Sequence, residues 1–356
     1  MLHLLDQSPD ALRAWLTGQG EPPFRAAQVR KWLLEKRAST FEEMTDLPKP
    51  LRDALAAQYA IFASRIAAHR HAADGTEKLL LELADGHRIE CVLIREQARR
   101  TICISTQVGC AMGCVFCASG LEGVIRNLTT GEIVEQMLQV ARLLDADDRL
   151  SNIVVMGMGE PLANIAALLP ALEIASSPTG LGISPRRITI STVGLPPAID
   201  RLTAEKHQYH LAVSLHAPND ELRTQLVPVN ENIGIQAIVE AADRYFEASG
   251  RRLTFEYVLL GGLNDQASHA RQLAALLKDR SALLNVIPYN PVAGLSYQTP
   301  SETARERFTE ILTRAGVNVA VRLRKGDKID AACGQLRRSL AQQAPGANVT
   351  VTLPLG

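Results

Sequence analysis

The stretch Thr101-Ile-Cys-Ile-Ser-Thr-Gln-Val-Gly-Cys110-Ala-Met-Gly-Cys114-Val-Phe-Cys117 joins a predicted strand to a loop that carries three cysteines. The strand is expected over residues 101–108. The C-x3-C-x2-C spacing that follows can place three thiolates around one corner of an iron–sulfur cubane, which leaves the fourth iron without a protein ligand. We therefore expect Cys110, Cys114 and Cys117 to bind one [4Fe-4S] cluster with an open coordination position, as catalysis at a metal requires.

A zinc site with Cys103 as the fourth ligand is the alternative interpretation of these cysteines. Cys103 lies inside the predicted strand, where it is poorly placed to share a metal with a tight loop. Structural zinc sites usually pair two C-x2-C knuckles, and this sequence has one such pair, at positions 114 and 117. The iron–sulfur interpretation is therefore favoured.

The overall composition predicts one large folded core and a small additional domain. The chain has 356 residues, of which 46% are hydrophobic and 21% are charged. Lysine plus arginine and aspartate plus glutamate both number 38, so any contact with nucleic acid must come from local patches. No basic leader precedes a long apolar run, and no segment approaches the roughly 18 apolar residues of a membrane-spanning helix. We expect a cytoplasmic protein that does not bind membranes.

Four regions are expected along the chain. The first is rich in helical segments separated by glycine and proline, and predicts an N-terminal helical accessory domain. The second predicts a β-hairpin extension around the turn Asp85-Gly86. The third is the core, and the fourth is a flexible tail rich in Ala, Gln and Pro. The expected boundaries are residues 1–60, 61–95, 96–336 and 337–356.

In the core, strand-like and helix-like segments alternate at a spacing that indicates right-handed βαβ units and a parallel sheet. A Thr-x-x-Glu start at Thr129–Glu132 predicts the beginning of the first helix. The expected fold class is α/β: a partial (β/α)6 barrel with the small N-terminal helical accessory domain. Strands are expected at 101–108, 152–156, 187–191, 210–215, 253–259, 284–288 and 317–322, and helices at 130–144, 165–175, 196–205, 236–248, 266–278 and 302–315.

Polar motifs follow several of these strands. Barrels place their ligands at the carboxyl ends of strands, so these motifs predict one site together with the cysteine loop. Each motif alone is also consistent with an ordinary turn. The motifs are Gly157-Met-Gly-Glu-Pro161, Ser191-Thr-Val-Gly194, Ser214-Leu-His216 and Pro288-Tyr-Asn-Pro291.

Two cysteines outside the loop, Cys103 and Cys333, carry the most information about chemistry. Clustered thiols in a long cytosolic chain indicate metal binding or catalysis rather than a disulfide framework. Cys333 is surrounded in sequence by Arg324, Lys325 and other basic residues, and positive charge favours a nucleophilic thiolate. Cys91, by contrast, is expected to be a buried, inert thiol.

These motifs together resemble those of the RlmN/Cfr family of RNA adenine methyltransferases, within the radical S-adenosylmethionine (SAM) superfamily. The likeness spans about residues 20 to 336. It implies a radical SAM barrel in which SAM fills the open iron position. The segments that carry it are Cys103-Ile-Ser-Thr-Gln-Val-Gly-Cys110, Arg126-Asn-Leu-Thr129, Met156-Gly-Met-Gly-Glu-Pro161, Ser214-Leu-His-Ala-Pro-Asn219 and Ala331-Ala-Cys-Gly-Gln335. The residues implied to bind SAM are Gly159, Glu160, Ser191, Ser214, Leu215, His216 and Asn290.

The resemblance also implies a mechanism that consumes two SAM molecules per turnover. Cys333 takes a methyl group from the first SAM. A radical made from the second removes a hydrogen atom from that methyl group, and the resulting carbon radical adds to the adenine. Glu90 is implied to accept the ring proton, although a solvated strand carboxylate is its ordinary interpretation. Cys103 then attacks the Cys333 sulfur and forms a transient disulfide, which a reductant must reset.

The implied substrate is carbon 2 of an adenosine in 23S rRNA near the peptidyl transferase centre, with the tRNA adenosine 3′ of the anticodon as a second candidate. The sister activity of the family modifies carbon 8, and Asp330 before Ala-Ala-Cys333 favours the carbon-2 enzymes. An electron donor such as flavodoxin is implied, and the chain is expected to be a monomer.

Two local patches are expected to contact RNA. Residues 322–338 hold six Lys or Arg and two Asp, an excess that can neutralise phosphates. The helix at 25–37 is basic, and Phe24 and Trp32 beside its basic residues can stack on bases. The alternative is a solvated helix whose Trp32 packs on the barrel. The target base is expected to leave its stack and enter the barrel.

Two other classes of function remain open on the residues alone. A non-enzymatic RNA-binding protein with a structural metal would contain zinc and would not need Cys333. A radical SAM enzyme that acts on a small molecule would have no use for the Cys103/Cys333 pair.

Overall fold

A ten-stranded sheet forms the centre of the computed structural model, which describes residues 1–322, 325–326 and 329–336. The strand order is β14-β13-β12-β11-β10-β9-β6-β5-β4-β3. From β6 to β14 every neighbouring pair is parallel, and from β3 to β6 every pair is antiparallel. The parallel strands are β6 (Arg99–Cys103), β9 (Asn152–Val155), β10 (Ile188–Thr192), β11 (His210–Ser214), β12 (Leu253–Leu259), β13 (Ala282–Pro288) and β14 (Asn318–Val321).

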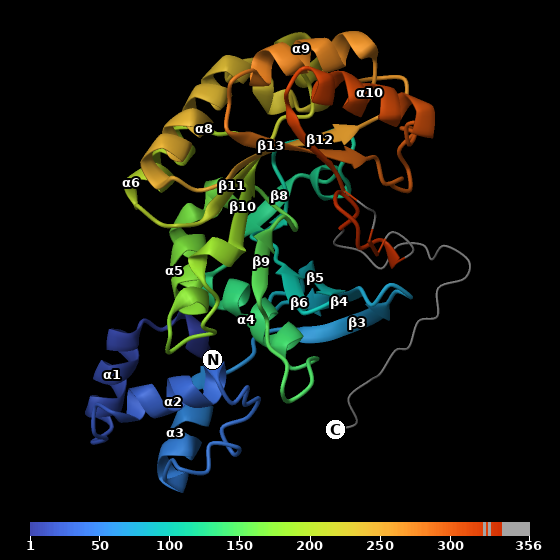
Figure 1. Cartoon of the computed structure of the whole chain (residues 1–356). Helices are drawn as coiled ribbons and strands as arrows, with labels where there is room; N and C mark the ends of the chain where they lie inside the picture. Colours follow the sequence, from blue (N-terminus) through green and yellow to red (C-terminus); the bar gives the residue numbers. More distant parts are fainter. Residues whose placement is uncertain (323–324, 327–328, 337–356) are drawn as a thin grey trace.

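Helices connect these parallel strands and cover the outer face of the curved sheet (Figure 1). This arrangement confirms the predicted partial (β/α)6 barrel, and β14 and β3 are the two edges of the open sheet. Helix α4 begins with the predicted capping box, in which Thr129 and Glu132 bond each other's backbone N–H groups. The connecting helices are α4 (Thr130–Ala141), α5 (Ile165–Ser176), α6 (Pro196–Ala204), α8 (Ile235–Ser249), α9 (Ala267–Leu277) and α10 (Glu302–Arg314).

The first core strand ends earlier than the sequence predicts. The segment expected as one strand at 101–108 divides into β6 and a separate strand, β7 (Gln107–Gly109), which pairs with β8 (Val124–Asn127) in a small sheet of its own. Buried side chains replace the ladder bonds at the break. The Ser105 N–H donates to Gln136 Oε1 (2.8 Å), and Gln136 Nε2 donates back to the Ser105 carbonyl (2.9 Å). This exchange with helix α4 turns the chain out of the main sheet.

The other differences between prediction and structure are a strand and a short helix that the sequence did not predict. The extension before the barrel contains three strands that pair in order, β3 (Arg65–His71), β4 (Glu77–Glu82) and β5 (Arg88–Glu96), where the sequence indicated a hairpin. The hairpin itself, with its turn at Asp85-Gly86, is confirmed between β4 and β5. A short helix, α7 (Asp220–Leu226), follows β11 and was not predicted.

The N-terminal region is helical, and its helices α1, α2 and α3 gather at one end of the molecule (Figure 1). Strand β1, before the three helices, pairs in parallel with strand β2, which follows them. None of the helices in the described part of the chain has the length and apolar character needed to cross a membrane. The bounds are β1 (Leu2–His3), α1 (Pro9–Gly18), α2 (Arg25–Leu34), α3 (Lys49–Gln58) and β2 (Tyr59–Ala60).

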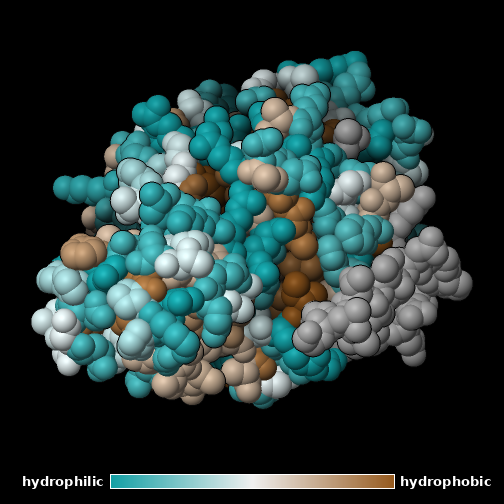
Figure 2. Space-filling model, turned by 90° about the horizontal axis from the view of Figure 1, so that it is seen from below, coloured by the Kyte–Doolittle hydropathy of each residue, from teal (hydrophilic) through white to brown (hydrophobic). Residues whose placement is uncertain are grey.

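Hydrophilic side chains cover most of the face seen in Figure 2, and hydrophobic side chains gather in a strip near its centre. The large core lies between the sheet and the helices and continues into the N-terminal helices. Leu16, Val29 and Leu55, one from each N-terminal helix, are fully buried in it. The N-terminal helices and the barrel therefore share one hydrophobic core.

The buried carboxylate of Glu135 joins the N-terminal region to the barrel. It accepts hydrogen bonds from His3 Nε2 (2.7 Å), the Ala63 N–H (2.9 Å) and the Ser64 N–H (3.0 Å). Burial acts to raise the pKa of this carboxyl, but these bonds outweigh it and hold the pKa below its ordinary value. A carboxyl whose pKa is lowered by folding stabilises the native state when it is ionised.

We expect Glu135→Gln to lower the free energy of unfolding by about 3 kcal/mol at neutral pH, because it breaks a buried charged network. Chemical denaturation measures this difference. The stabilising effect of Glu135 is complete above the unfolded-state pKa of about 4.3 and is lost as the pH falls through the lower folded-state pKa. The free energies of unfolding of the wild type and the variant should therefore become equal in acid. The exposed Glu247→Gln is the control, and an equal loss in that variant would contradict the interpretation.

Candidate active site

A cavity at the carboxyl ends of the barrel strands brings together most of the residues that the sequence predicted for one site. Its volume is about 160 Å³. Its lining combines the three cysteines of the loop with residues at or near the carboxyl ends of five parallel strands, β9 to β13. The predicted residues that line it are Cys110, Cys114, Cys117, Gly159, Glu160, Ser191, Ser214, His216, Asn290 and Cys333. Leu215 does not line it, because its side chain is fully buried in the core.

The three loop cysteines suit a metal cluster better than a single ion. Burial, together with the neighbouring thiols, raises the pKa of Cys110 to about 12, and it also raises the pKa of Cys114 and Cys117. Buried thiolates need a positive partner, and iron supplies one. Tetrahedral zinc would hold its sulfurs about 3.8 Å apart. Among the described residues the loop sulfurs do not gather within 4.8 Å of one another as ligands of one ion would.

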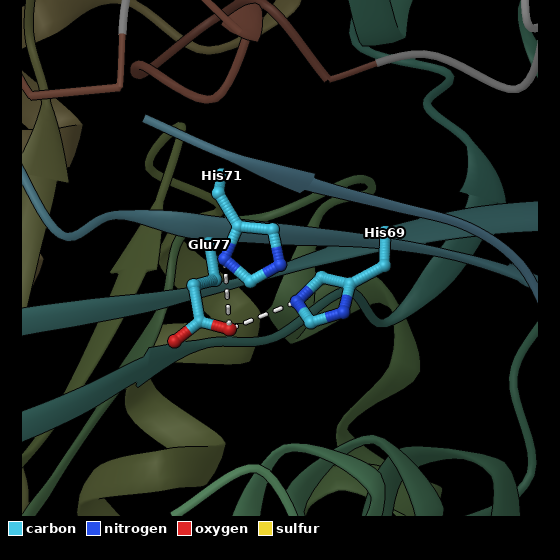
Figure 3. Close-up of side chains that lie close together, drawn as sticks. All are labelled: His69, His71 and Glu77. Atoms are coloured by element: carbon cyan, nitrogen blue, oxygen red, sulfur yellow. Dashed lines mark hydrogen bonds and ion pairs between the residues drawn. The ribbon is translucent and has the colours of Figure 1, made fainter. Parts of the chain in front are cut away.

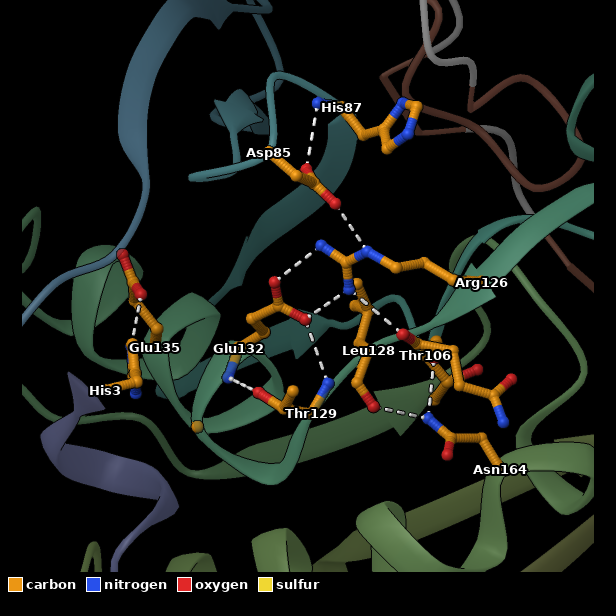
Figure 4. A network of polar contacts seen from close by, with 12 residues as sticks. His3, Asp85, His87, Thr106, Arg126, Leu128, Thr129, Glu132, Glu135 and Asn164 are labelled. Atoms are coloured by element: carbon orange, nitrogen blue, oxygen red, sulfur yellow. Dashed lines mark hydrogen bonds and ion pairs between the residues drawn. The ribbon is translucent and has the colours of Figure 1, made fainter. Parts of the chain in front are cut away.

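The cysteine loop depends on close packing at Gly109. This residue has a positive φ of 81°, and a Cβ there would lie 2.0 Å from the Gly123 carbonyl oxygen. Beyond the loop, Arg126 on β8 donates to Asp85 Oδ2 (2.6 Å) and to both carboxylate oxygens of Glu132 (2.8 Å each). Figure 4 shows that Arg126 joins the hairpin turn to the start of α4. The loop is therefore fixed at both of its ends.

Glu160 holds two strand ends together. Its carboxylate accepts hydrogen bonds from the Leu162 N–H (3.0 Å) and from the Val193 N–H (2.8 Å), which follows β10. Burial raises the pKa of this carboxyl, and the hydrogen bonds that it accepts oppose the rise. Gly159 beside it has a φ of 102°, and a Cβ there would meet the Gln107 side chain at 2.6 Å.

Arg223 is a fully buried arginine that the sequence analysis did not single out. It comes from α7 and donates to the carbonyls of Leu215 (3.0 Å), Ser214 (3.0 Å) and Val193. It also donates to Asn230 Oδ1 (2.6 Å). Burial lowers the pKa of this guanidinium to about 10. Arg223 therefore shapes the ends of β10 and β11, which carry the predicted ligand-binding residues.

His216 connects the end of β11 to the cysteine loop. It has a positive φ of 60°, which is unusual for a residue with a side chain. Its Nδ1 accepts a hydrogen bond from the Val258 N–H (3.1 Å), and its ring makes an edge contact with Phe116 at 4.9 Å between centroids. Burial, and then the charge of Arg223, lower the pKa of His216 to about 3. The imidazole is therefore neutral at physiological pH.

Two hydrogen-bond acceptors that face this cavity have no partner within the described residues. They are Oε2 of Glu256, on β12, and Oδ1 of Asn290, after β13. Asn285 Nδ2 donates a hydrogen bond to the other carboxylate oxygen of Glu256, Oε1 (3.0 Å). Buried acceptors without partners are costly, so a ligand with hydrogen-bond donors fits here. Sequence reasoning missed Glu256, and the available signal was a charged residue in the middle of an otherwise apolar strand.

A second and larger cavity, of about 900 Å³, occupies the barrel interior. Cys103 and Cys333 both line it, and Cys333 lines the smaller cavity as well. Burial, followed by the nearby Cys333, raises the pKa of Cys103 to about 12. The guanidinium of Arg322 lies close to both thiols, and its pKa is raised, most strongly by Cys333. Cys91 is fully buried, as expected.

Hydrogen bonds fix the Cys333 segment against the cysteine loop. The Ala118 N–H donates to the Gly334 carbonyl (2.8 Å), and Ser119 Oγ donates to the Leu336 carbonyl (2.9 Å). Asn290 Nδ2 donates to the Cys333 carbonyl (3.3 Å). The Cys333 segment therefore lies against the end of the loop that carries Cys110, Cys114 and Cys117. Cys103, 230 positions before Cys333 in the sequence, shares the larger cavity with it.

Glu90 lies outside the lining of both cavities. It is buried, and its carboxylate pairs with Lys78 (2.9 Å). Lys78 Nζ also donates to the Asp330 carbonyl (2.9 Å), three residues before Cys333. Glu90 is thus connected to the Cys333 segment through Lys78.

A further group with metal-ligating atoms lies on the three-stranded extension (Figure 3). His69 and His71 of β3 and Glu77 of β4 bring one ligand atom each within 4.8 Å of one another. The same carboxylate of Glu77 is paired with Arg95 (2.6 Å). Because Arg95 already balances this charge, we interpret the group as a cross-strand ion-pair cluster.

The basic helix at the N-terminus makes mostly internal contacts. Arg25 bonds Glu21 and Gln28, and Arg37 donates to the carbonyls of Ala141 and Asp148 (2.7 Å each). Trp32 packs against the core. In the second expected patch, residues 323–324, 327–328 and 337–338 lie outside the described residues, as does the predicted tail at 337–356.

Comparison with known proteins gives the family. Residues 2–61 match the ribosomal RNA large subunit methyltransferase N-terminal domain, and residues 104–274 match the radical SAM superfamily. The chain is 65% identical to a probable dual-specificity RNA methyltransferase RlmN of Rhodopirellula baltica, over 95% of this chain and 91% of that protein. It is 45% identical to the Bacillus subtilis protein of the same name, over 92% and 91% respectively.

A solved structure agrees with these relatives. The crystal structure of a radical SAM methyltransferase from Sphaerobacter thermophilus superposes with a TM-score of 0.92 at 43% sequence identity. The match covers 95% of this chain and 100% of that one. The radical SAM fold implies a [4Fe-4S] cluster and SAM, and the donor set of the smaller cavity fits both.

We expect Glu256→Gln to weaken the binding of SAM about tenfold in the cluster-loaded protein, because a charged acceptor is worth about 1.5 kcal/mol or more to its donor. Calorimetry without RNA measures this binding independently of turnover. Glu306→Gln, on the exposed surface of α10, is the matched control. Unchanged affinity in the Glu256 variant would show that its carboxylate does not touch the ligand.

Proposed function

Because the chain belongs to the RlmN family of radical SAM RNA methyltransferases, we propose that it methylates carbon 2 of an adenosine in 23S rRNA near the peptidyl transferase centre. The tRNA adenosine 3′ of the anticodon is the second proposed substrate. The relatives that match most of this chain are named as dual-specificity RNA methyltransferases. We further propose that the protein is a cytoplasmic monomer and that it receives electrons from a donor such as flavodoxin.

The observation that carries this proposal is the position of Cys333. It lines both the small cavity with the three loop cysteines and the large cavity with Cys103. A thiol at this junction can accept a group on one side and deliver it on the other. A radical SAM enzyme without a methyl carrier would have no use for a second thiol beside it.

The residues of the smaller cavity are proposed to hold the cofactors. Cys110, Cys114 and Cys117 would bind the cluster. Once bound, the cluster supplies the electron that cleaves SAM. The SAM residues are proposed as Gly159, Glu160, Ser191, Ser214, His216 and Asn290, with Glu256 in addition and with Leu215 contributing only its backbone.

The two thiols are proposed to act in sequence. The Cys333 thiolate attacks the methyl group of one SAM, so that a new S–C bond forms, the bond between the methyl group and the sulfonium of SAM breaks, and S-adenosylhomocysteine leaves. The second SAM, cleaved by the electron that the cluster would supply, would provide the acceptor of one hydrogen atom from this methyl group. Once the carbon has joined the adenine, the adduct must give up the ring proton and one electron, which the bound cluster would accept. Cys103 then attacks the Cys333 sulfur: the S–S bond forms, the S–C bond to the product breaks, and the product carbon takes the electron pair of that bond and a proton to become the methyl group.

Glu90 is proposed to accept the proton that leaves the ring carbon. Its ion pair with Lys78, and the bond from Lys78 to the Asp330 carbonyl, connect it to the Cys333 segment. The carboxylate reaches the substrate only if this pair opens. The Glu90–Lys78 pair is therefore also proposed to position the Cys333 segment.

We expect Cys103→Ala to stop turnover after the carbon–carbon bond has formed, because no thiol remains to release the product from Cys333. The variant should accumulate a covalent protein–RNA adduct, which denaturing gel electrophoresis and peptide mass spectrometry at Cys333 detect. Cys91→Ala is the control, since that thiol is fully buried and outside both cavities. A Cys103→Ala protein that releases methylated RNA at the wild-type rate would rule out the two-thiol mechanism.

We expect the reconstituted enzyme to convert adenosine to 2-methyladenosine in both a 23S rRNA fragment and tRNA. Nucleoside mass spectrometry against 2-methyl and 8-methyl standards identifies the modified carbon. An 8-methyl product would assign the chain to the sister activity, and modification of rRNA alone would remove tRNA from the proposal.

A further inference from the structure

The larger cavity extends to the amino-terminal end of the barrel, opposite the cysteine loop. Its lining includes residues that begin β6, β9 and β11 or directly precede β10 and β12. Because these strands are parallel, their first residues lie at one end of the barrel and their last residues at the other. The lining residues at the amino-terminal end are Arg99, Thr101, Ser151, Asn152, Arg186, Arg187, His210 and Arg252.

Positive charge dominates the lining of this cavity. Among the described residues of the lining, the basic ones are Arg99, Arg186, Arg187, Arg252, Arg322 and Lys325, and the one acid is Glu96. Lys325 pairs with Glu96 at 2.7 Å. The cavity is therefore strongly basic although the whole chain is electrically neutral. Such a local field attracts an anion.

Three of these arginines, Arg186, Arg187 and Arg252, form what we call the arginine rim. Each is exposed, and none has a side-chain hydrogen bond or ion pair to another described residue. Most other arginines of the barrel are engaged, as Arg244 is with Asp200 and Arg280 with Asp243. Like charges held together without counterions repel one another, so the rim is best satisfied by a bound anion.

The wall of the cavity leads from the rim to the two thiols. Side chains alternate along a strand, so residues two apart face the same side. Thr101 and Cys103 of β6 face the cavity, as do Asn152, Val154 and Met156 along β9. The rim and the thiols are thus parts of one continuous space. A volume of about 900 Å³ is in the range of sites that enclose a nucleotide-sized ligand.

We infer that the RNA enters the barrel from its amino-terminal end, with the phosphates that flank the target adenosine on the arginine rim and the flipped base directed toward Cys333. This inference rests on the proposed function and adds the route and the binding surface. Guanidinium groups match phosphate oxygens through paired hydrogen bonds, and a flipped base needs its neighbouring phosphates held. The route keeps the RNA away from the SAM cavity at the other end.

Several of the described basic residues on the two surfaces that the sequence favoured are already engaged. Arg25 and Arg37 of the basic N-terminal segment bond groups of the protein itself. In the patch after β14, Lys325 is paired with Glu96, whereas Arg322 lies inside the cavity near the thiols. The unpaired arginines at the rim therefore carry the inference.

The test compares the charge-reversed double variant Arg186→Glu/Arg187→Glu with Arg271→Glu/Arg307→Glu, whose arginines lie exposed on α9 and α10 outside both cavities. Fluorescence anisotropy with an anticodon stem-loop RNA gives the affinity as a function of salt. At about 0.1 M salt, losing two phosphate contacts weakens binding by roughly one to two orders of magnitude, and the slope of log K against log salt flattens by about 1.4 to 1.8. The control should keep most of its affinity.

SAM binding and thermal unfolding, measured without RNA, show whether each variant retains its fold and its cofactor cavity. The inference is overturned if the rim variant keeps both the affinity and the salt slope of the wild type, or if the control loses as much. A wild-type enzyme that binds the RNA at the rim but methylates none overturns the proposed function, and leaves the rim as a binding surface. The two failures are therefore distinguishable.

Discussion

The hydrogen bonds around Ser105 determine where the reactive sulfurs lie. A backbone segment that leaves a sheet inside a protein must find new partners for its polar groups, and Gln136 of α4 provides them. Ser105 Oγ also donates to the Glu90 carbonyl and accepts from the Met158 N–H. Because β6 stops here, Cys103 stays in the barrel wall while the chain carries the next three cysteines to the carboxyl end.

This division of one short segment gives the barrel two chemically different ends. At the carboxyl end, buried thiols and unpartnered acceptors surround a small cavity. At the amino-terminal end, exposed arginines surround a wide one. Arg223 and Glu160 stabilise the first by joining neighbouring strand ends, and the segment with Cys333 lies where the two spaces meet.

The sequence predicted what depends on local pattern. The βα alternation and the capping box at Thr129 follow from residues close together in the chain, and the structure confirms them. The cysteine motif is equally local, and its binding of a cluster stays a prediction. The break after Cys103 could not be predicted, because strand propensity is local whereas Gln136 lies 31 positions from Ser105. The arginine rim had a readable signal, since Arg187 begins one predicted parallel strand and Arg252 directly precedes another.

Entry from opposite ends also bears on the order of events. A reaction that uses two molecules of the same cosubstrate must discard a spent one and admit a fresh one. If RNA and cosubstrate entered the active site by the same opening, the RNA would have to dissociate during that exchange, or bind only after it. On the proposed route and the proposed two-SAM cycle, separate entrances would let S-adenosylhomocysteine leave and the second SAM arrive while the RNA stays bound. A single encounter with the RNA can then include the whole cycle.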